Sequence, residues 1–189
     1  MRGLRMLRFL AVAAGLICAS AAGATEAGWA LLREGGQVVL MRPAIAPGAG
    51  APPNLYTSDC RTQRNLSDRG RQQAKRIGAL FDTRAERVER VLSSRYCRCL
   101  DTARIAFRGV EPEPFEALDP PHGDEAAAKA RRDAVLSVVD DFSGQGNLVM
   151  ITHLETIKAL TGQSPRGGEA LIVRRNGEAL HVLARIVFN

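Results

Sequence analysis

Two arginines and a histidine occupy positions from which they could bind an anion together. Arg42 directly follows one predicted strand, Arg98 lies one helical turn beyond a second, and His153 directly follows a third. These strands span residues 37–41, 89–93 and 147–152, and the first and third have the apolar composition of buried strands. In open α/β sheets, ligands bind outside the carboxyl ends of the strands, so the three side chains should converge there. Guanidinium groups match phosphate oxygens, which makes a phosphate-sized anion the expected ligand.

Each of these residues also has an ordinary interpretation. A single arginine is more often a surface or ion-paired residue, and a single histidine more often caps a helix or lies in a core. The hypothesis of a shared anion site depends on their joint placement after three separate strands.

The elements that must position these residues alternate between strand and helix. Apolar residues recur with a period of two in some segments and about 3.6 in others, which indicates one α/β domain. Ser67 is expected to cap a helix, Ser94 to cap a second, and further helices are expected over 124–142 and up to Gly162. Asn176-Gly177 predicts a hairpin turn between two C-terminal strands. Residues 43–65 contain four prolines and predict a long loop, which in a compact domain is usually functional.

The first 24 residues have the pattern of a signal peptide. Three arginines (Arg2, Arg5 and Arg8) precede an apolar run over residues 9–19, and Ala22-Gly23-Ala24 offers a cleavage site. The apolar run is shorter than the roughly 20 residues that span a bilayer, so a retained anchor is the less favoured alternative. We therefore expect residues 25–189 to form a periplasmic or secreted domain with no stable membrane anchor after cleavage.

The charge of the chain argues against nucleic acid as a partner. The formal net charge is +6, and removal of the three leader arginines (26 − 3 basic against 20 acidic residues) leaves +3. That value is too mild for a nucleic-acid binder on charge alone. We expect no cofactor, and the histidines and cysteines show no spacing typical of a metal site.

Three cysteines remain in the mature chain. Cys97 and Cys99 are two residues apart, so on a helix they point to nearly opposite sides and only one can face Cys60. An oxidising compartment would permit a disulfide, whereas three buried thiols are the alternative.

Four ordered segments resemble the histidine phosphatase superfamily, the group that includes phosphoglycerate-mutase-like phosphatases. These segments are VLMR (39–42), NLSDRGRQQA (65–74), SSRYCRCLDTA (93–103) and VMITH (149–153). The resemblance covers essentially all of residues 36–188. It implies a three-layer α/β/α sandwich with a mostly parallel central sheet and a C-terminal hairpin. It also implies that Cys60 and Cys97 lie near the pocket rim, where we expect them to form a disulfide.

The resemblance also implies a mechanism, in which a histidine attacks phosphorus while two arginines and a second histidine hold the phosphate oxygens. Arg42, Arg98 and His153 match the phosphate-holding positions. The position of the attacking histidine is Pro43, which has no nucleophilic side chain and no backbone N–H. The remaining histidines offer no obvious replacement, because His122 lies in a proline-rich segment and His181 in the last hairpin strand.

The family places a proton donor in the segment after the second arginine's helix. Four acids of this segment are candidates, and we prefer Asp119 among Glu116, Asp119, Asp124 and Glu125. Ordinary loop or N-cap roles are the alternative, in particular for Asp124.

Three hypotheses about function follow. The first is an active phosphomonoesterase with an unrecognised nucleophile, and the third is a non-catalytic scaffold for protein contacts. The second, which we favour, is an exported protein that binds phosphate or a small phosphorylated ligand with little or no hydrolysis. Retention of Arg42, Arg98 and His153 favours it over the scaffold, and Pro43 favours it over the enzyme.

Overall fold

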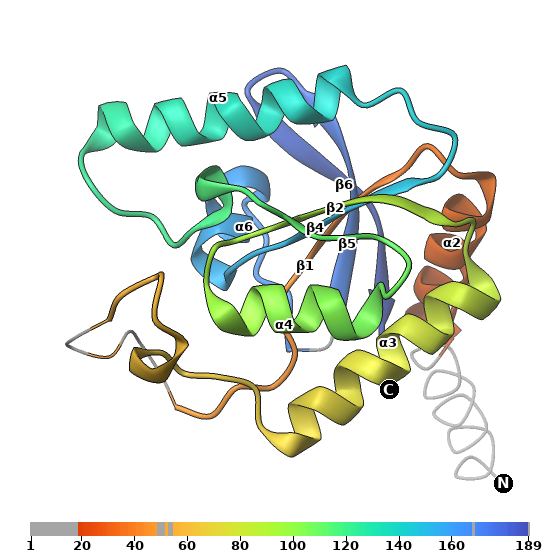
Figure 1. Cartoon of the computed structure of the whole chain (residues 1–189). Helices are drawn as coiled ribbons and strands as arrows, with labels where there is room; N and C mark the ends of the chain where they lie inside the picture. Colours follow the sequence, from red (N-terminus) through yellow and green to blue (C-terminus); the bar gives the residue numbers. More distant parts are fainter. Residues whose placement is uncertain (1–18, 49–51, 53–54, 168, 189) are drawn as a thin grey trace, which may run out of the picture.

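A six-stranded sheet with helices on both faces forms the centre of the computed structural model, which describes residues 19–48, 52, 55–167 and 169–188 (Figure 1). The strand order is β3-β2-β4-β1-β5-β6. Neighbouring strands from β3 to β1 run parallel, whereas β5 is antiparallel to both β1 and β6. The strands are β1 (Val38–Met41), β2 (Val88–Ser93), β3 (Glu113–Pro114), β4 (Asn147–Ile151), β5 (Glu169–Asn176) and β6 (Ala179–Val187).

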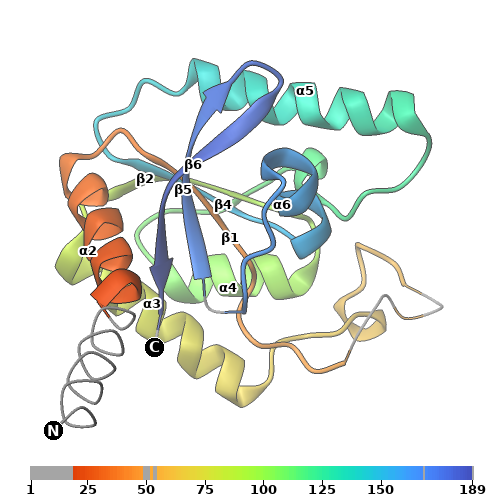
Figure 2. The same ribbon diagram turned by 180° about the vertical axis from the view of Figure 1, so that it is seen from behind.

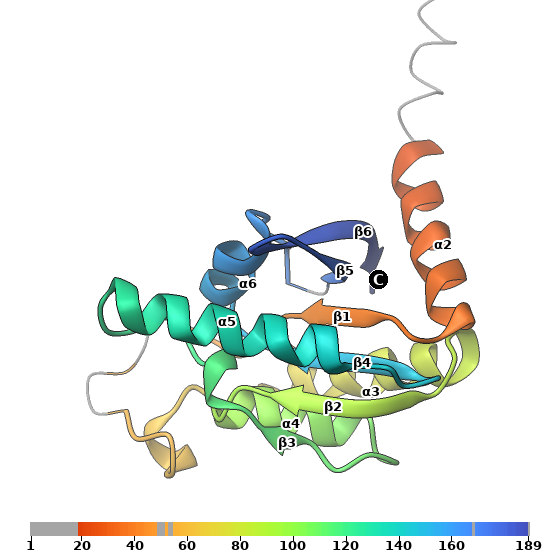
Figure 3. The ribbon, with the colours of Figure 1, turned by 90° about the horizontal axis from the view of Figure 1, so that it is seen from above.

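The helices form two layers because the strands are apolar on both faces. Successive side chains of a strand point to opposite faces. Val39 and Met41 therefore belong to one buried cluster, and Val38 and Leu40 to the other. Helices α2 (Ala19–Glu34), α3 (Asp68–Arg84) and α4 (Cys97–Ala106) cover the first face, and α5 (Glu125–Asp141) and α6 (Leu154–Thr161) the second (Figures 2 and 3). The predicted three-layer sandwich with a C-terminal hairpin is confirmed.

The second half of α2 is part of the core. Trp29 and Leu32 are buried, and Trp29 meets Phe81 and Phe188 edge-on. Gly28 lets the helix approach β6 closely, because a Cβ there would lie 2.6 Å from Ile186 Cγ1. The expected cleavage site falls within α2, ahead of these contacts, and most of the expected signal peptide lies outside the described residues. No helix among the described residues is long and apolar enough to cross a membrane.

Local signals located most helix ends correctly. Ser67 caps α3 by accepting a hydrogen bond from the Gly70 N–H, and Asp124 caps α5. Ser94 does not cap α4, which begins at Cys97 after the N-cap residue Tyr96. The Ser94 hydroxyl is instead engaged with residues of other segments, which are described below.

The hairpin turn lies one residue later than its sequence signal indicates. Asn176 pairs with Ala179, so Gly177 and Glu178 form the turn. Gly177 has φ +63°, a conformation that glycine adopts without strain.

Candidate anion-binding site

The three predicted strands end at the same edge of the sheet. Met41 of β1 and Ser93 of β2 both pair with Ile151 of β4. The residues that follow these strands are therefore brought side by side, as their positions in the sequence predict.

A cavity of about 530 Å³ opens at this edge, and Arg42, Arg98 and His153 all line it. Two charged residues that the sequence did not single out, Arg64 and Glu155, lie in the same wall. The complete lining is Arg42, Pro43, Ala44, Ile45, Ala46, Gly48, Arg64, Gln73, Tyr96, Arg98, Pro120, His153, Leu154, Glu155 and Gly167. Three guanidinium groups against one carboxylate make the lining favourable for an anion.

The segment that carries Pro43 is held in place by two helices. The Ala44 N–H donates to Thr102 Oγ1 of α4 at 3.0 Å, and the Ile45 N–H donates to Gln73 Oε1 of α3 at 3.0 Å. Gly70 lets α3 touch this segment, because a Cβ there would lie 2.0 Å from the Ile45 carbonyl oxygen. Pro43 is therefore fixed in the pocket wall by its neighbours rather than by bonds of its own.

His153 lies at the floor of the pocket and is 4% exposed. Arg98 Nη2 lies 2.8 Å from Nδ1, and Ser94 Oγ lies 2.8 Å from Nε2. Because a guanidinium can only donate, Nδ1 accepts and Nε2 carries the proton of the neutral ring. Burial, with the charges of Arg98 and Arg42, lowers the pKa of His153 to about 3. The unliganded pocket therefore holds a neutral histidine at neutral pH.

The arginines are oriented by contacts at the pocket wall. The Arg98 guanidinium lies 5.0 Å from the centre of the Tyr96 ring, and that ring meets His153 edge-on at 4.8 Å. Arg42 Nη1 lies 3.4 Å from the Pro165 carbonyl oxygen. These contacts leave both guanidinium groups half-buried at the cavity, where they can bind oxygens of a ligand.

Asp119, our sequence-based candidate for the proton donor, does not line the pocket. It is buried behind His153, where it accepts hydrogen bonds from Ser94 Oγ and from the backbone and side chain of Arg95. It is therefore not placed to protonate a leaving group in the cavity. Sequence spacing located the segment but could not show that its carboxylate turns inward.

The other three candidate acids also lie outside the pocket lining. Glu116 pairs with Arg95, Asp124 caps α5, and Glu125 occupies the first turn of that helix. Among the described lining residues the carboxylate is that of Glu155, two residues after His153. The sequence signal for it was its place in the first turn of the helix after the third strand.

The two further histidines lie away from the cavity lining. His122 Nδ1 lies 3.0 Å from the Pro120 carbonyl oxygen in an exposed loop, and His181 is in β6. Neither is positioned to take the place of a nucleophile at Pro43.

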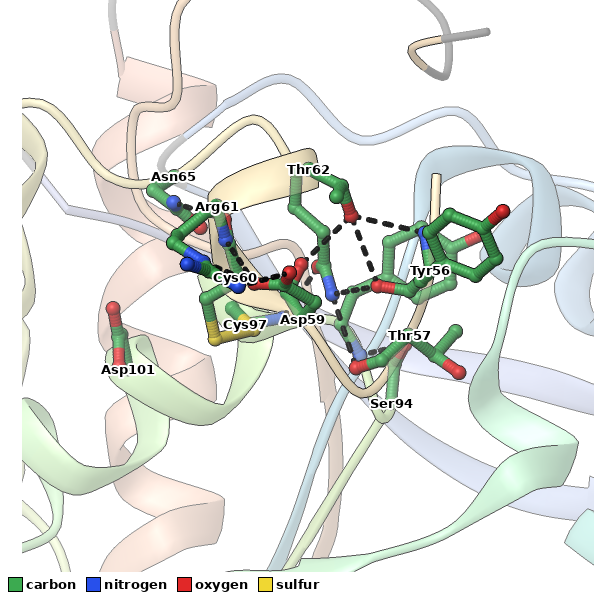
Figure 4. The surroundings of a disulfide bond; sticks show 12 residues. Tyr56, Thr57, Asp59, Cys60, Arg61, Thr62, Asn65, Ser94, Cys97 and Asp101 are labelled. Carbon is green, nitrogen blue, oxygen red and sulfur yellow. Dashed lines mark hydrogen bonds and ion pairs between the residues drawn. A yellow bond between two sulfur atoms is a disulfide. The ribbon is translucent and has the colours of Figure 1, made fainter. Parts of the chain in front are cut away.

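A disulfide joins Cys60 to Cys97, with Cα atoms 5.7 Å apart, in the pair expected from the family resemblance (Figure 4). Beside it, Gln63 Oε1 accepts from the Cys97 N–H at 2.9 Å. These two links hold the long loop against the start of α4. They are made by residues close in the sequence to Arg64 on the loop and to Arg98 on the helix. Cys99 is a buried free thiol, and burial raises its pKa to about 12, so it is not a reactive thiolate at neutral pH.

Comparison with known proteins agrees with this architecture. Residues 57–120 match the model of the histidine phosphatase superfamily (branch 1). No curated protein matches the chain by sequence. The fold is similar to that of the protein histidine phosphatase SixA complexed with tungstate, with TM-score 0.57, 19% identity, and coverage of 80% of this chain and 96% of that one.

Two further structures are similar at the level of the fold. The alpha-ribazole phosphatase from Shigella flexneri has TM-score 0.58 and 15% identity, with coverage of 81% of this chain and 96% of the other. A mycobacterial glucosyl-3-phosphoglycerate phosphatase complexed with inorganic phosphate has TM-score 0.58 and 15% identity, with coverage of 81% and 97%.

The family-model match covers residues 57–120, and the fold over most of the chain is similar to that of the solved structures named above. The solved structures named above are phosphatases, so the chain resembles phosphatases in its fold and, over residues 57–120, in its sequence.

Proposed function

We propose that this protein binds phosphate or a small phosphorylated ligand through Arg42, Arg98 and His153, with little or no hydrolysis. The observation that carries the proposal is that these three side chains line one cavity together with Pro43. Arg64 adds a third guanidinium to the same wall. In two of the similar structures the bound species is an oxyanion, tungstate in one and inorganic phosphate in the other.

The residue at position 43 disfavours hydrolysis. Covalent phosphoryl transfer in this superfamily uses an attacking histidine, and the matching position here holds a proline ring. His153 is the lining residue with an imidazole, but its Nδ1 accepts from Arg98 and its Nε2 faces Ser94. In a well-studied hydrolase, loss of the nucleophile costs on the order of 10⁶ in rate.

Release of inorganic phosphate from a generic phosphate monoester tests the proposal. We expect negligible turnover for the wild type and measurable turnover for Pro43→His, because the neighbouring segment is already fixed by Thr102 and Gln73. The matched control is Pro43→His combined with Arg42→Ala, which should lose the restored activity.

Wild-type turnover could contradict the proposal in two ways. Turnover abolished by Arg42→Ala would support the second candidate function, an active phosphomonoesterase, for which Glu155 and His153 supply ionisable groups in the pocket. Turnover that survives both Arg42→Ala and His153→Ala would indicate a different site.

We further propose that the protein acts in the periplasm or outside the cell, after cleavage behind Ala24. The leader pattern of residues 1–24 supports this proposal, as does the Cys60–Cys97 bond, which is typical of an oxidising compartment. N-terminal sequencing of protein recovered from the periplasm or medium should begin at Thr25. Recovery of the full-length chain from the cytoplasm alone would contradict it.

A further inference from the structure

Asp119 is a buried carboxylate that does not reach the cavity. It is 2% exposed, and three donors converge on it. The Arg95 backbone N–H and Nε–H donate at 2.8 and 2.7 Å, and the Ser94 hydroxyl donates at 2.8 Å. The carboxylate is therefore satisfied by its neighbours, and its connection to the anion site runs through Ser94.

The Ser94 hydroxyl lies between Asp119 and His153 and can give away only one proton. Because Asp119 accepts that proton, Ser94 Oγ must act as an acceptor toward Nε2 of His153, 2.8 Å away. Asp119 thus requires the proton of the neutral ring to lie on Nε2.

The other end of the chain of hydrogen bonds imposes the same direction. Arg98 has no acceptor atom, so the 2.8 Å contact of its Nη2 with Nδ1 requires an unprotonated Nδ1. Each hydrogen bond therefore points the same way along this chain: Arg98 donates to His153, His153 donates to Ser94, and Ser94 donates to Asp119. Thr156 Oγ1 donates to the Asp119 carbonyl oxygen at 3.0 Å and fixes the backbone at the far end.

We propose that Asp119 is a positioning residue that, through the Ser94 hydroxyl, holds His153 in the neutral tautomer whose bare Nδ1 faces Arg98 and the anion site. The inference rests on the proposed function, because it concerns how His153 meets the anion. With Nε2 committed to Ser94, a proton taken up by His153 must go to Nδ1. Such a proton would face the Arg98 donor, so it fits only when a ligand oxygen lies between Nδ1 and Arg98 and accepts from both.

The substitution Asp119→Asn tests this role with almost no change in shape. Oδ1 of Asp119 accepts from both Ser94 Oγ and the Arg95 backbone N–H, and Oδ2 accepts from Arg95 Nε–H, so an amide must direct its NH₂ group either at Arg95 Nε or at Ser94 together with the Arg95 backbone N–H. In the second arrangement Ser94 is free to donate to Nε2, which moves the histidine proton to Nδ1, against Arg98. We therefore expect a second His153 tautomer. Because Ser94 donating to Nε2 also keeps the ring from becoming doubly protonated, we expect a loss of roughly tenfold in phosphate affinity, the effect of one hydrogen bond from a charged group.

The measurement is ¹⁵N NMR of histidine-labelled protein without ligand, followed by calorimetric titration with inorganic phosphate. The chain has three histidines, and His153→Gln assigns the His153 signals. Glu116→Gln is the matched control, because Glu116 also pairs with Arg95, at 3.0 Å, and its removal leaves the bond from Ser94 to Asp119 in place. It should keep the wild-type tautomer and affinity.

Two results would overturn the inference. One is a wild-type His153 with its proton on Nδ1, and the other is an Asp119→Asn protein that retains both the wild-type tautomer and affinity. If Asp119→Asn does not fold, Ser94→Ala replaces it. It removes the link from Asp119 to His153, so phosphate affinity should fall by a similar factor while Arg98 keeps Nδ1 unprotonated. A wild type that binds no phosphate would contradict the proposed function, whereas the tautomer in unliganded protein would still decide the role of Asp119.

Discussion

At the scale of single residues, His153 has an acid–base behaviour far from that of an ordinary histidine. Its ring is buried between two arginines and Ser94, and this environment lowers its pKa from 6.5 to about 3. A phosphate anion placed between Arg42 and Arg98 would offset their charge and favour the protonated ring. The residue is thus neutral while the pocket is empty and is well placed to respond to a bound anion.

The depressed pKa of His153 predicts a specific loss of stability in acid. Between pH 6.5 and about 3 the unfolded chain binds a proton at this position that the folded chain does not. The free energy of unfolding should therefore fall as the pH falls through this window, by up to about 1.4 kcal/mol per pH unit from this residue. Urea unfolding at several pH values should show a shallower dependence for His153→Gln.

Equal slopes for the two proteins would contradict this prediction. The comparison isolates His153 because the ionisable groups that face it remain in both. These groups are Arg42 and Arg98 on the pocket side, Tyr96 and Cys99 beside the ring, and Asp119 behind Ser94.

At the scale of elements, the pocket depends on how α3 and α4 hold the segment after β1. The Ile45 carbonyl oxygen accepts from the Ser67 N–H at 3.1 Å, at the start of α3. Gly70, one turn into that helix, touches the same carbonyl group. The glycine is therefore needed for close approach rather than for an unusual backbone angle.

Gly70→Ala should weaken the pocket. Its new Cβ would lie 2.0 Å from the Ile45 oxygen, so α3 or the Pro43 segment must move. We expect a loss of roughly 1 to 3 kcal/mol in stability, despite the better helix propensity of alanine, together with weaker phosphate binding. Gly109→Ala is the matched control, because nothing lies within 4 Å of a Cβ there. Thermal unfolding and phosphate titration of both variants test this prediction. Equal stability and equal phosphate affinity of the two variants would contradict the proposed close packing at Gly70.

The Cys60–Cys97 disulfide is a second structural restraint on the pocket, in addition to the packing of α3 and α4 against the segment after β1. It closes a sequence separation of 37 residues and holds the Arg64 loop against α4. Reduction should lower stability by roughly 2 to 4 kcal/mol and weaken phosphate binding, because the loop regains conformational freedom. Titrations with and without reductant measure the effect, and the Cys60→Ser, Cys97→Ser double variant should be indifferent to reductant. Unchanged phosphate affinity after complete reduction would show that the bond does not position the pocket.

At the scale of the whole molecule, the sequence predicted the layers better than it predicted contacts within the site. Strands such as β1 and β4 are nearly continuous apolar runs, and Ser67 and Asp124 are local signals that need no tertiary information. These features sufficed to predict an α/β domain and the convergence of Arg42, Arg98 and His153, whereas the three-layer arrangement was implied by the family resemblance.

What the sequence could not supply depends on which way a side chain turns. Asp119 has the spacing of a pocket acid but is drawn inward by Arg95 and Ser94. For the same reason Ser94 is a residue type that often caps helices, but its hydroxyl donates to Asp119 and contacts His153. Arg64 reaches the pocket from the long loop, whose path no local periodicity describes.

The central claim, that an arginine-lined pocket binds phosphate, is tested most directly by calorimetric titration of the wild type with inorganic phosphate. We predict one site per chain, with binding strongly weakened by Arg98→Ala and by Arg42→Ala. Lys129→Ala, on the opposite helical layer and paired with Asp133, should bind like the wild type. The account is contradicted if the wild type shows no saturable binding, or if its binding is unaffected by loss of either arginine.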